Sequence, residues 1–170
     1  YHYRIDKNQM IASRIAGGVI WSYGNATTAP YTEQFYIGGA NSVRAFSARS
    51  IGPGGYPPET DRKYTYINHV GDIRMEANIE YRFRMIADLH GAVFLDAGNV
   101  WLMRKDENRP NGEFTLKNFP KQIALGTGFG LRYDLDFLVF RLDLGIGLHD
   151  PYDTGKSGYY NIPKFKDSMA

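Results

Sequence analysis

The 170-residue sequence contains no cysteine and no apolar run long enough to form a transmembrane helix. The absence of cysteine excludes a disulfide framework, thiolate catalysis and a cysteine-ligated zinc or iron–sulfur site. A membrane helix would need about 18 consecutive apolar residues. A membrane β-barrel stays possible, because its strands alternate lipid-facing apolar with lumen-facing polar residues. Its mean hydropathy, here -0.41, therefore resembles that of a soluble protein.

The sequence also has little excess charge and no recognisable catalytic or metal-binding pattern. Its net charge is only +2, and basic residues are interspersed with acidic ones, so we expect no nucleic-acid partner. The four histidines have no ligand-like spacing, and no nucleophile lies in a pattern with a base. The glycines of GTGFG alternate within a predicted strand and precede no helix, unlike a phosphate-binding loop. We therefore predict no enzyme activity, no metal and no cofactor.

What the sequence does have is strict alternation of apolar and polar residues, together with 15% aromatic residues. From Asp72 to Arg84 the even positions are polar, and the odd positions carry residues such as Ile73, Ile79 and Phe83. Further strands are predicted over residues 122–137, 138–149, 91–101, 10–23 and 1–5. Most of these runs exceed the five or six residues usual in soluble proteins and suit a tilted membrane-spanning strand, which needs about 9 to 11. The predicted class is all-β and antiparallel, with about five or six long strands.

The connections between these strands alternate strictly between short and long. Those at 6–9, 86–90 and around Asp136 are short, whereas those at 24–71, 102–120 and after His149 are long and polar. Outer-membrane barrels combine tight periplasmic turns with long extracellular loops in this way. Trp21, Tyr23 and Trp101 are then expected at the outer strand ends, as an aromatic girdle. Arginines of 72–84 must face the lumen, because each would cost about 2 to 4 kcal/mol in the middle of the lipid.

Alternation alone also permits a soluble, aromatic-rich β-sandwich that binds carbohydrate, because antiparallel sheets often have one wet face. That fold requires the odd residues of 73–85 to be buried against a second sheet. The membrane interpretation has its own requirement, since six strands cannot close a barrel that needs at least about eight. The chain begins at Tyr1 without Met or a signal peptide. We therefore expect the natural protein to contain further strands upstream.

Two sequence motifs resemble those of a known protein family. The stretch FYIGGANSVRAF resembles the long sixth extracellular loop of the BamA/TamA family of outer-membrane barrels, in which a V/I-R-G-F/Y tetrad lies at the tip. The stretch FLDAGNVW resembles the F-x-D-x-G strand motif that meets the tetrad arginine in that family. The resemblance also implies that Glu80 lies near the same arginine. The loop motif comprises Gly38, Gly39, Val43, Arg44, Ala45 and Phe46, and the strand motif comprises Phe94, Asp96 and Gly98.

The residue chemistry supports this resemblance independently. Arginine presents a planar fork that can hold a carboxylate with two hydrogen bonds, so Arg44 with Asp96 or Glu80 could lock the loop inside the lumen. The alternative is that Arg44 is an ordinary solvated loop charge. Glycines at inward positions leave two predicted strands without side chains on the lumen side. This either allows another segment to approach closely or marks a bend in the sheet. These lumen-facing glycines are Gly126, Gly128, Gly130, Gly145 and Gly147.

The resemblance implies that residues 1–170 are the C-terminal part of a 16-stranded outer-membrane barrel of a Gram-negative bacterium. It implies insertion or export of other outer-membrane proteins through a lateral gate. The implied partners are outer-membrane lipid, unfolded outer-membrane proteins and periplasmic or inner-membrane assembly proteins. Ala45 replaces the usual glycine of the tetrad, which favours a TamA-like subfamily, and the last barrel strand is expected to be missing after KFKDSMA. A two-partner secretion translocator and a passive porin would share the barrel.

Overall fold

The chain folds into long β-strands joined by loops of very unequal length. A computed structural model describes residues 1–24, 29–57, 69–86, 88–135 and 137–153, so the predicted end at KFKDSMA lies outside the described residues. The only helical element in the described ranges is the 3-10 helix η2 (Phe119–Gln122). The strands are β1 (His2–Asp6), β2 (Gln9–Val19), β3 (Ile73–Ile86), β4 (Leu89–Trp101), β5 (Ala124–Asp134) and β6 (Val139–His149).

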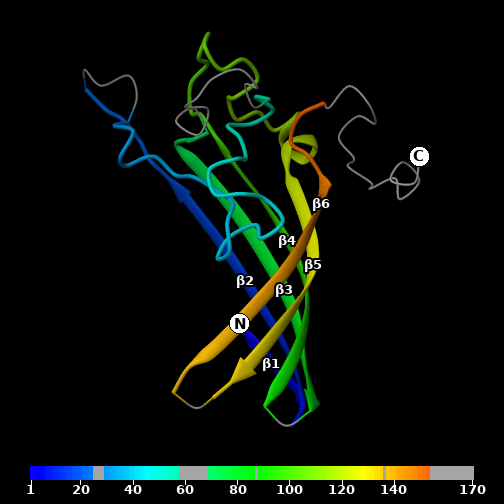
Figure 1. Cartoon of the computed structure of the whole chain (residues 1–170). Helices are drawn as coiled ribbons and strands as arrows, with labels where there is room; N and C mark the ends of the chain where they lie inside the picture. The colour runs from blue at the N-terminus through cyan, green and yellow to red at the C-terminus, as the bar shows by residue number, and fades with distance from the viewer. Residues whose placement is uncertain (25–28, 58–68, 87, 136, 154–170) are drawn as a thin grey trace, which may run out of the picture.

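All six strands form one antiparallel sheet in the order of the sequence, β1-β2-β3-β4-β5-β6. Strands β2 to β6 are 11 to 14 residues long, whereas β1 has five. Strands β1 and β6 are the two edges, so the sheet does not close on itself (Figure 1). The β1–β2 turn lies at one end of the sheet, together with the end of β3, the start of β4, the end of β5 and the start of β6. The described parts of the long segments between β2 and β3 and between β4 and β5 begin and end at the other end (Figure 1). The predicted all-β, antiparallel fold is confirmed.

The two faces of the sheet differ as the alternation predicts. Glu80 pairs with Ala12 on β2 and with Phe94 on β4, and these residues share the face that we call the inner face. Glu80 and Asp96 are buried there, whereas Ile79 on the opposite, outer face is 53% exposed. The soluble sandwich would require the odd residues of β3 to be covered by a second sheet. The exposure of Ile79 shows that this requirement is not met.

Two local predictions about the strand ends are wrong. Strand β2 ends at Val19, so residues 20–23 with Trp21 and Tyr23 follow the strand and are not part of it. Trp101 is completely buried and so cannot belong to an exposed aromatic girdle. Its ring packs edge-on against Phe114 at 5.6 Å between centroids, and its indole N–H donates to Gln122 at 2.9 Å. The segment after β4 folds back over this side chain, which alternation within a strand cannot indicate.

The described hydrophobic core lies between the inner face and the segment that joins β2 to β3, residues 24–71, hereafter the loop. The cyan part of the loop descends from the end with the long segments toward the middle of the strands (Figure 1). Apolar side chains of the loop and of the sheet are fully buried together; they are Ile37, Val43, Ile51, Val100 and Ala124. Each large apolar side chain buried in this way contributes about 1.5 to 3 kcal/mol. In the described part of the chain, no helix is long and apolar enough to cross a membrane.

Candidate functional site

The candidate site lies where the tip of the loop, residues 38–46, meets the inner face of β3 and β4. Gly38 and Gly39 start the tip with φ of +104° and +91°, a backbone conformation that favours glycine. A Cβ on Gly38 would lie 2.1 Å from the carbonyl oxygen of Ser47. The Gly39 N–H donates to the Phe46 carbonyl at 2.8 Å and closes the turn. This turn reverses the chain and presents residues 42–45 to the sheet.

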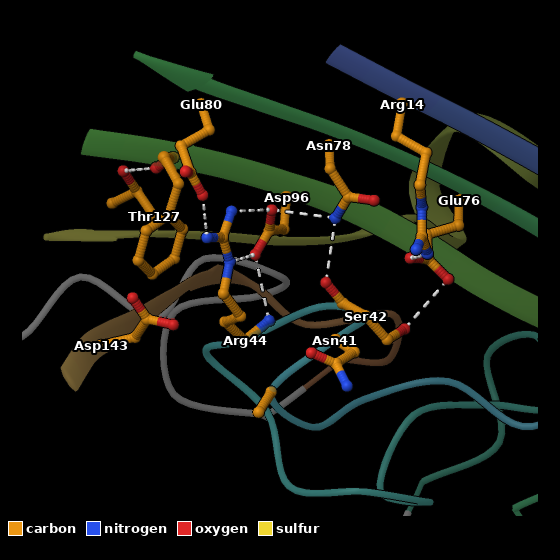
Figure 2. A network of polar contacts seen from close by, with 12 residues as sticks. Arg14, Asn41, Ser42, Arg44, Glu76, Asn78, Glu80, Asp96, Thr127 and Asp143 are labelled. Carbon is orange, nitrogen blue, oxygen red and sulfur yellow. Dashed lines mark hydrogen bonds and ion pairs between the residues drawn. The ribbon is translucent and has the colours of Figure 1, made fainter. Parts of the chain in front are cut away.

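Arg44 binds Asp96 through both arms of its fork (Figure 2). Its Nε donates to Oδ2 and its Nη2 to Oδ1, each at 2.8 Å, and its backbone N–H also donates to Oδ2 at 3.1 Å. The Asp96 side chain has no exposed surface, and that of Arg44 is 8% exposed. This is the bidentate geometry that makes an arginine–carboxylate contact strong and specific in direction.

Glu80 completes the surroundings of the guanidinium. Arg44 Nη1 donates to one Glu80 oxygen, and the other oxygen accepts from Arg82 Nε at 2.5 Å and from Arg132 Nη2 at 2.6 Å. The guanidinium lies over the Phe94 ring, 3.6 Å from Cζ to the ring centroid, which adds a cation–π contact. Burial lowers the pKa of Arg44, but the hydrogen bonds and charges of Asp96 and Glu80 outweigh it and raise that pKa above its ordinary value. Arg44 is therefore charged at every physiological pH.

A second set of contacts, which the sequence analysis did not identify, surrounds Ser42 (Figure 2). The Ser42 hydroxyl donates to Glu76 at 3.0 Å and accepts the Gly38 N–H at 3.3 Å. The Asn78 amide donates to the Ser42 carbonyl and to Asp96 Oδ1, both at 2.9 Å. Positions 76, 78 and 80 are the consecutive inward positions of β3. Their even numbering in the alternating strand predicts that all three face inward, but it does not indicate which loop residue they contact.

The structure divides the five lumen-facing glycines into two groups. Three receive the loop, because a Cβ on Gly126 or Gly145 would lie within 3 Å of Ala45, and one on Gly147 would lie 3.1 Å from the Phe46 ring. The other two receive side chains of the sheet itself, since Gly128 accommodates the Phe94 ring and Gly130 accommodates Asp143. Gly98 of the strand motif lies close to Ile37 of the loop, 3.2 Å from a Cβ position. The bare strands therefore form the surface on which the tip rests.

The contacts of the site attach the loop tip to the inner face of β3 and β4. Both carboxylates that contact Arg44 are paired with arginines, Asp96 with Arg44 itself and Glu80 with Arg44, Arg82 and Arg132. Among the described residues, no group of three or more His, Asp or Glu side chains is placed to hold a metal ion. Ala45 has an ordinary backbone conformation, because positive φ at described non-glycine residues is confined to Arg49 and Asn111. Alanine thus fits this position without backbone strain.

Comparison with known proteins identifies the family. The family model described as the Omp85 superfamily domain matches residues 1–161. The chain belongs to the Omp85 superfamily. The protein is therefore an outer-membrane protein, and we expect the exposed outer face of this Omp85 domain, with Ile79, to be the face that meets lipid.

Two relatives carry the name outer membrane protein assembly factor BamA. The protein from Nitratidesulfovibrio vulgaris is 28% identical over the whole chain, which spans 19% of that relative. The protein from Neisseria meningitidis serogroup B is 29% identical over 49% of the chain, corresponding to 11% of that relative. The chain therefore spans less than a fifth of the length of these relatives. They do not distinguish a BamA-like from a TamA-like subfamily, so the TamA-like assignment stays a prediction.

A solved structure agrees with the fold. The crystal structure of BamA from Haemophilus ducreyi lacking POTRA domains 1–3 superposes on 86% of this chain with a TM-score of 0.66 and 19% sequence identity. The match covers 30% of that chain. The six-stranded open sheet of this Omp85 domain therefore has the fold of part of a larger barrel.

We expect Gly145→Ala to displace the loop tip in the full-length protein. The new Cβ would lie 2.8 Å from Cα and 3.0 Å from N of Ala45, and a backbone contact of this kind cannot be relieved by rotating a side chain. The expected loss of stability is about 1 to 3 kcal/mol, measured by urea unfolding, together with faster proteolysis of the loop. Gly17→Ala is the matched control, because its Cβ meets only the Arg74 carbonyl at 3.6 Å. Equal effects of both substitutions would contradict this account.

Proposed function

We propose that this Omp85 domain supplies the docked loop and part of the wall of a barrel that assembles other proteins into the outer membrane. The wall is here the six-stranded sheet. The observation that carries the proposal is the attachment of the loop tip to the inner face through Arg44, Asp96 and Glu80. The assembly-factor names of the two BamA relatives support it. The activity, substrates and partners are proposed here for the whole protein to which this chain contributes.

In the proposed mechanism, an unfolded outer-membrane protein adds a strand to an exposed edge of the barrel at a lateral gate. Unpaired strand edges are templates for such β-augmentation. The wall must keep its curvature while the gate opens, and the docked loop joins strands that are not neighbours. Arg44 is bound to β3 and β4, and Arg141 of β6 donates to the Ala40 carbonyl at 2.7 Å. Periplasmic or inner-membrane proteins would deliver the substrate, and outer-membrane lipid would receive it.

Two other functions use a similar barrel. A passive porin needs an open lumen, whereas here the tip lies on the inner face and covers residues such as Asp96. A two-partner secretion translocator passes its substrate across the membrane and does not integrate it. The fate of the substrate is therefore the property that separates assembly from translocation.

The test uses the full-length protein in lipid vesicles, with a urea-unfolded outer-membrane protein as substrate. We expect the substrate to become membrane-integrated and protease-resistant several-fold faster than in vesicles without the protein. Vesicles that contain the heat-unfolded protein are the control. Recovery of the substrate in soluble form inside the vesicles would contradict assembly in favour of translocation. Solute flux without any substrate integration would contradict it in favour of a porin.

A further inference from the structure

The loop tip has a second attachment to the inner face, two residues before Arg44. The Glu76 side chain has no exposed surface, and its carboxylate is held by two arginines of the sheet, Arg14 on β2 and Arg74 on β3, the latter at 2.5 Å. The Ser42 hydroxyl is the loop's donor to this carboxylate, at 3.0 Å. Because the wall itself holds Glu76 from both sides, Ser42 meets an acceptor whose position does not depend on the loop.

The two attachments follow the same strand. Glu76 and Glu80 lie on one face of β3, four residues apart, which corresponds to about 13 Å along a strand. Figure 2 shows Ser42 beside Glu76 and Asn78 at one end of this row, and Arg44 beside Asp96 and Glu80 at the other. A tip held only at Arg44 could pivot about the guanidinium. A tip held at both ends has one direction along β3 and one register.

The position of Ser42 within the tip links this contact to the shape of the turn. Its hydroxyl oxygen also accepts the Gly38 N–H at 3.3 Å, and its backbone N–H donates to the Gly39 carbonyl at 3.0 Å. The same residue therefore closes the turn that begins at the paired glycines and fastens that turn to the wall. Its backbone carbonyl, which accepts from Asn78, would stay in place if the hydroxyl alone were removed.

We propose that the contact between Ser42 and Glu76 is a positioning latch, which sets the register of the tip so that the guanidinium of Arg44 meets Asp96. Ser42 and Glu76 are positioning residues and act through Arg44. The inference rests on the proposed function only for its consequence in assembly, since the register of the loop is a structural property that can be measured separately.

The test measures loop docking directly in the full-length protein, in a form that carries no other cysteine. Val43, the residue between Ser42 and Arg44 in the sequence, is completely buried. The thiol introduced by Val43→Cys is therefore accessible to a maleimide only when the tip leaves the wall. We expect Ser42→Ala to raise the labelling rate about tenfold or more, because a hydrogen bond to a charged acceptor is lost. Ser42→Thr keeps the hydroxyl and should restore slow labelling. Ser50→Ala is the matched control, since that hydroxyl donates only to the Ser47 carbonyl within the loop.

Double variants distinguish a positioning latch from an independent second attachment. Ser42→Ala combined with Arg44→Ala should give clearly less than the product of the two single increases, because Ser42 acts by positioning the guanidinium that Arg44→Ala removes. Ser42→Ala combined with Glu76→Ala should give clearly less than the product, because both remove the same contact. Migration of the unheated protein as a folded barrel on a gel verifies that each variant has folded.

Unchanged labelling in Ser42→Ala would overturn the latch, and so would equal labelling in Ser42→Ala and Ser50→Ala. A product relationship for the Ser42 and Glu76 pair, or for the Ser42 and Arg44 pair, would overturn it as well. Substrate integration is measured on the same variants. Faster labelling with undiminished integration would support the latch and contradict the proposed role of the docked loop in assembly, so the two failures are distinguishable.

Discussion

Arg44→Ala is expected to destabilise the docked loop by about 3 to 5 kcal/mol, the cost of removing one partner from a buried ion pair. The reason is the state in which Asp96 is left. This carboxylate is completely buried, and without Arg44 its remaining described side-chain donor is the Asn78 amide. In the full-length protein we expect much faster proteolysis of the loop and a strong loss of substrate integration, with insertion of the barrel itself retained.

The complementary substitution should have a smaller effect. In Asp96→Ala the guanidinium keeps Glu80 and the face of Phe94, so Arg44 is not stranded. The double variant should be little worse than Arg44→Ala alone, as coupled partners in a double-mutant cycle require. Arg104→Ala removes an exposed arginine of another loop and is the control, with an expected change within about 0.5 kcal/mol. Strict additivity of the Arg44 and Asp96 effects would show that the two side chains do not act as a pair.

A charge on the outer face is the second substitution with a large expected effect. Ile79 lies near the middle of β3, pairs with Ser13 and Leu95, and is exposed on the face that we expect to meet lipid. Ile79→Arg should therefore cost about 2 to 4 kcal/mol, the penalty for arginine near the midplane of the bilayer. The measurement is the urea dependence of folding into lipid vesicles, followed as the fraction that migrates as folded barrel without heating.

The matched control places the same charge on the other face of the same region. Ala12 pairs with Glu80 across β2 and β3 and lines a cavity on the inner face, beside Arg14 and Arg82. Ala12→Arg adds a guanidinium to a space that already holds arginines and a carboxylate. It should lower the free energy of unfolding by less than about 1 kcal/mol. If Ile79→Arg and Ala12→Arg impaired folding equally, the assignment of lipid-facing and lumen-facing sides would be wrong.

Alternation along the sequence was sufficient to predict the strands and their two faces, because side chains of a strand alternate between opposite faces. Arginines and carboxylates at the even positions of 72–84 could only be accommodated away from lipid, so the inward side of β3 followed from charge alone. The prediction was weakest at strand ends. Residues 20–23 continue the apolar character of β2, but β2 ends at Val19, and the next backbone contact, from the Ile20 N–H, is to the carbonyl of Asp72, the residue before β3.

The pairing of Arg44 with Asp96 and Glu80 could be anticipated from two motifs and from the fork of the guanidinium, although 52 residues separate Arg44 from Asp96. The contacts of Ser42 could not be anticipated from the sequence. A serine in a loop can donate to any acceptor within reach, and only the turn at Gly38 and Gly39 brings its hydroxyl to Glu76. The same holds for Trp101, whose burial depends on a segment that folds back over it after the strand has ended.

The sequence by itself therefore determined the strands, apart from their ends, and the two faces of the sheet, since both depend on local periodicity. The motifs of the family resemblance indicated the carboxylate partners of the tip arginine. Only the tertiary structure decided where the loop crosses the wall. It showed that Gly126, Gly145 and Gly147 receive the loop, while Gly128 and Gly130 receive Phe94 and Asp143. The physical reason is that close packing is set by the distance between segments far apart in the chain, and a missing Cβ provides space without specifying which neighbour fills it.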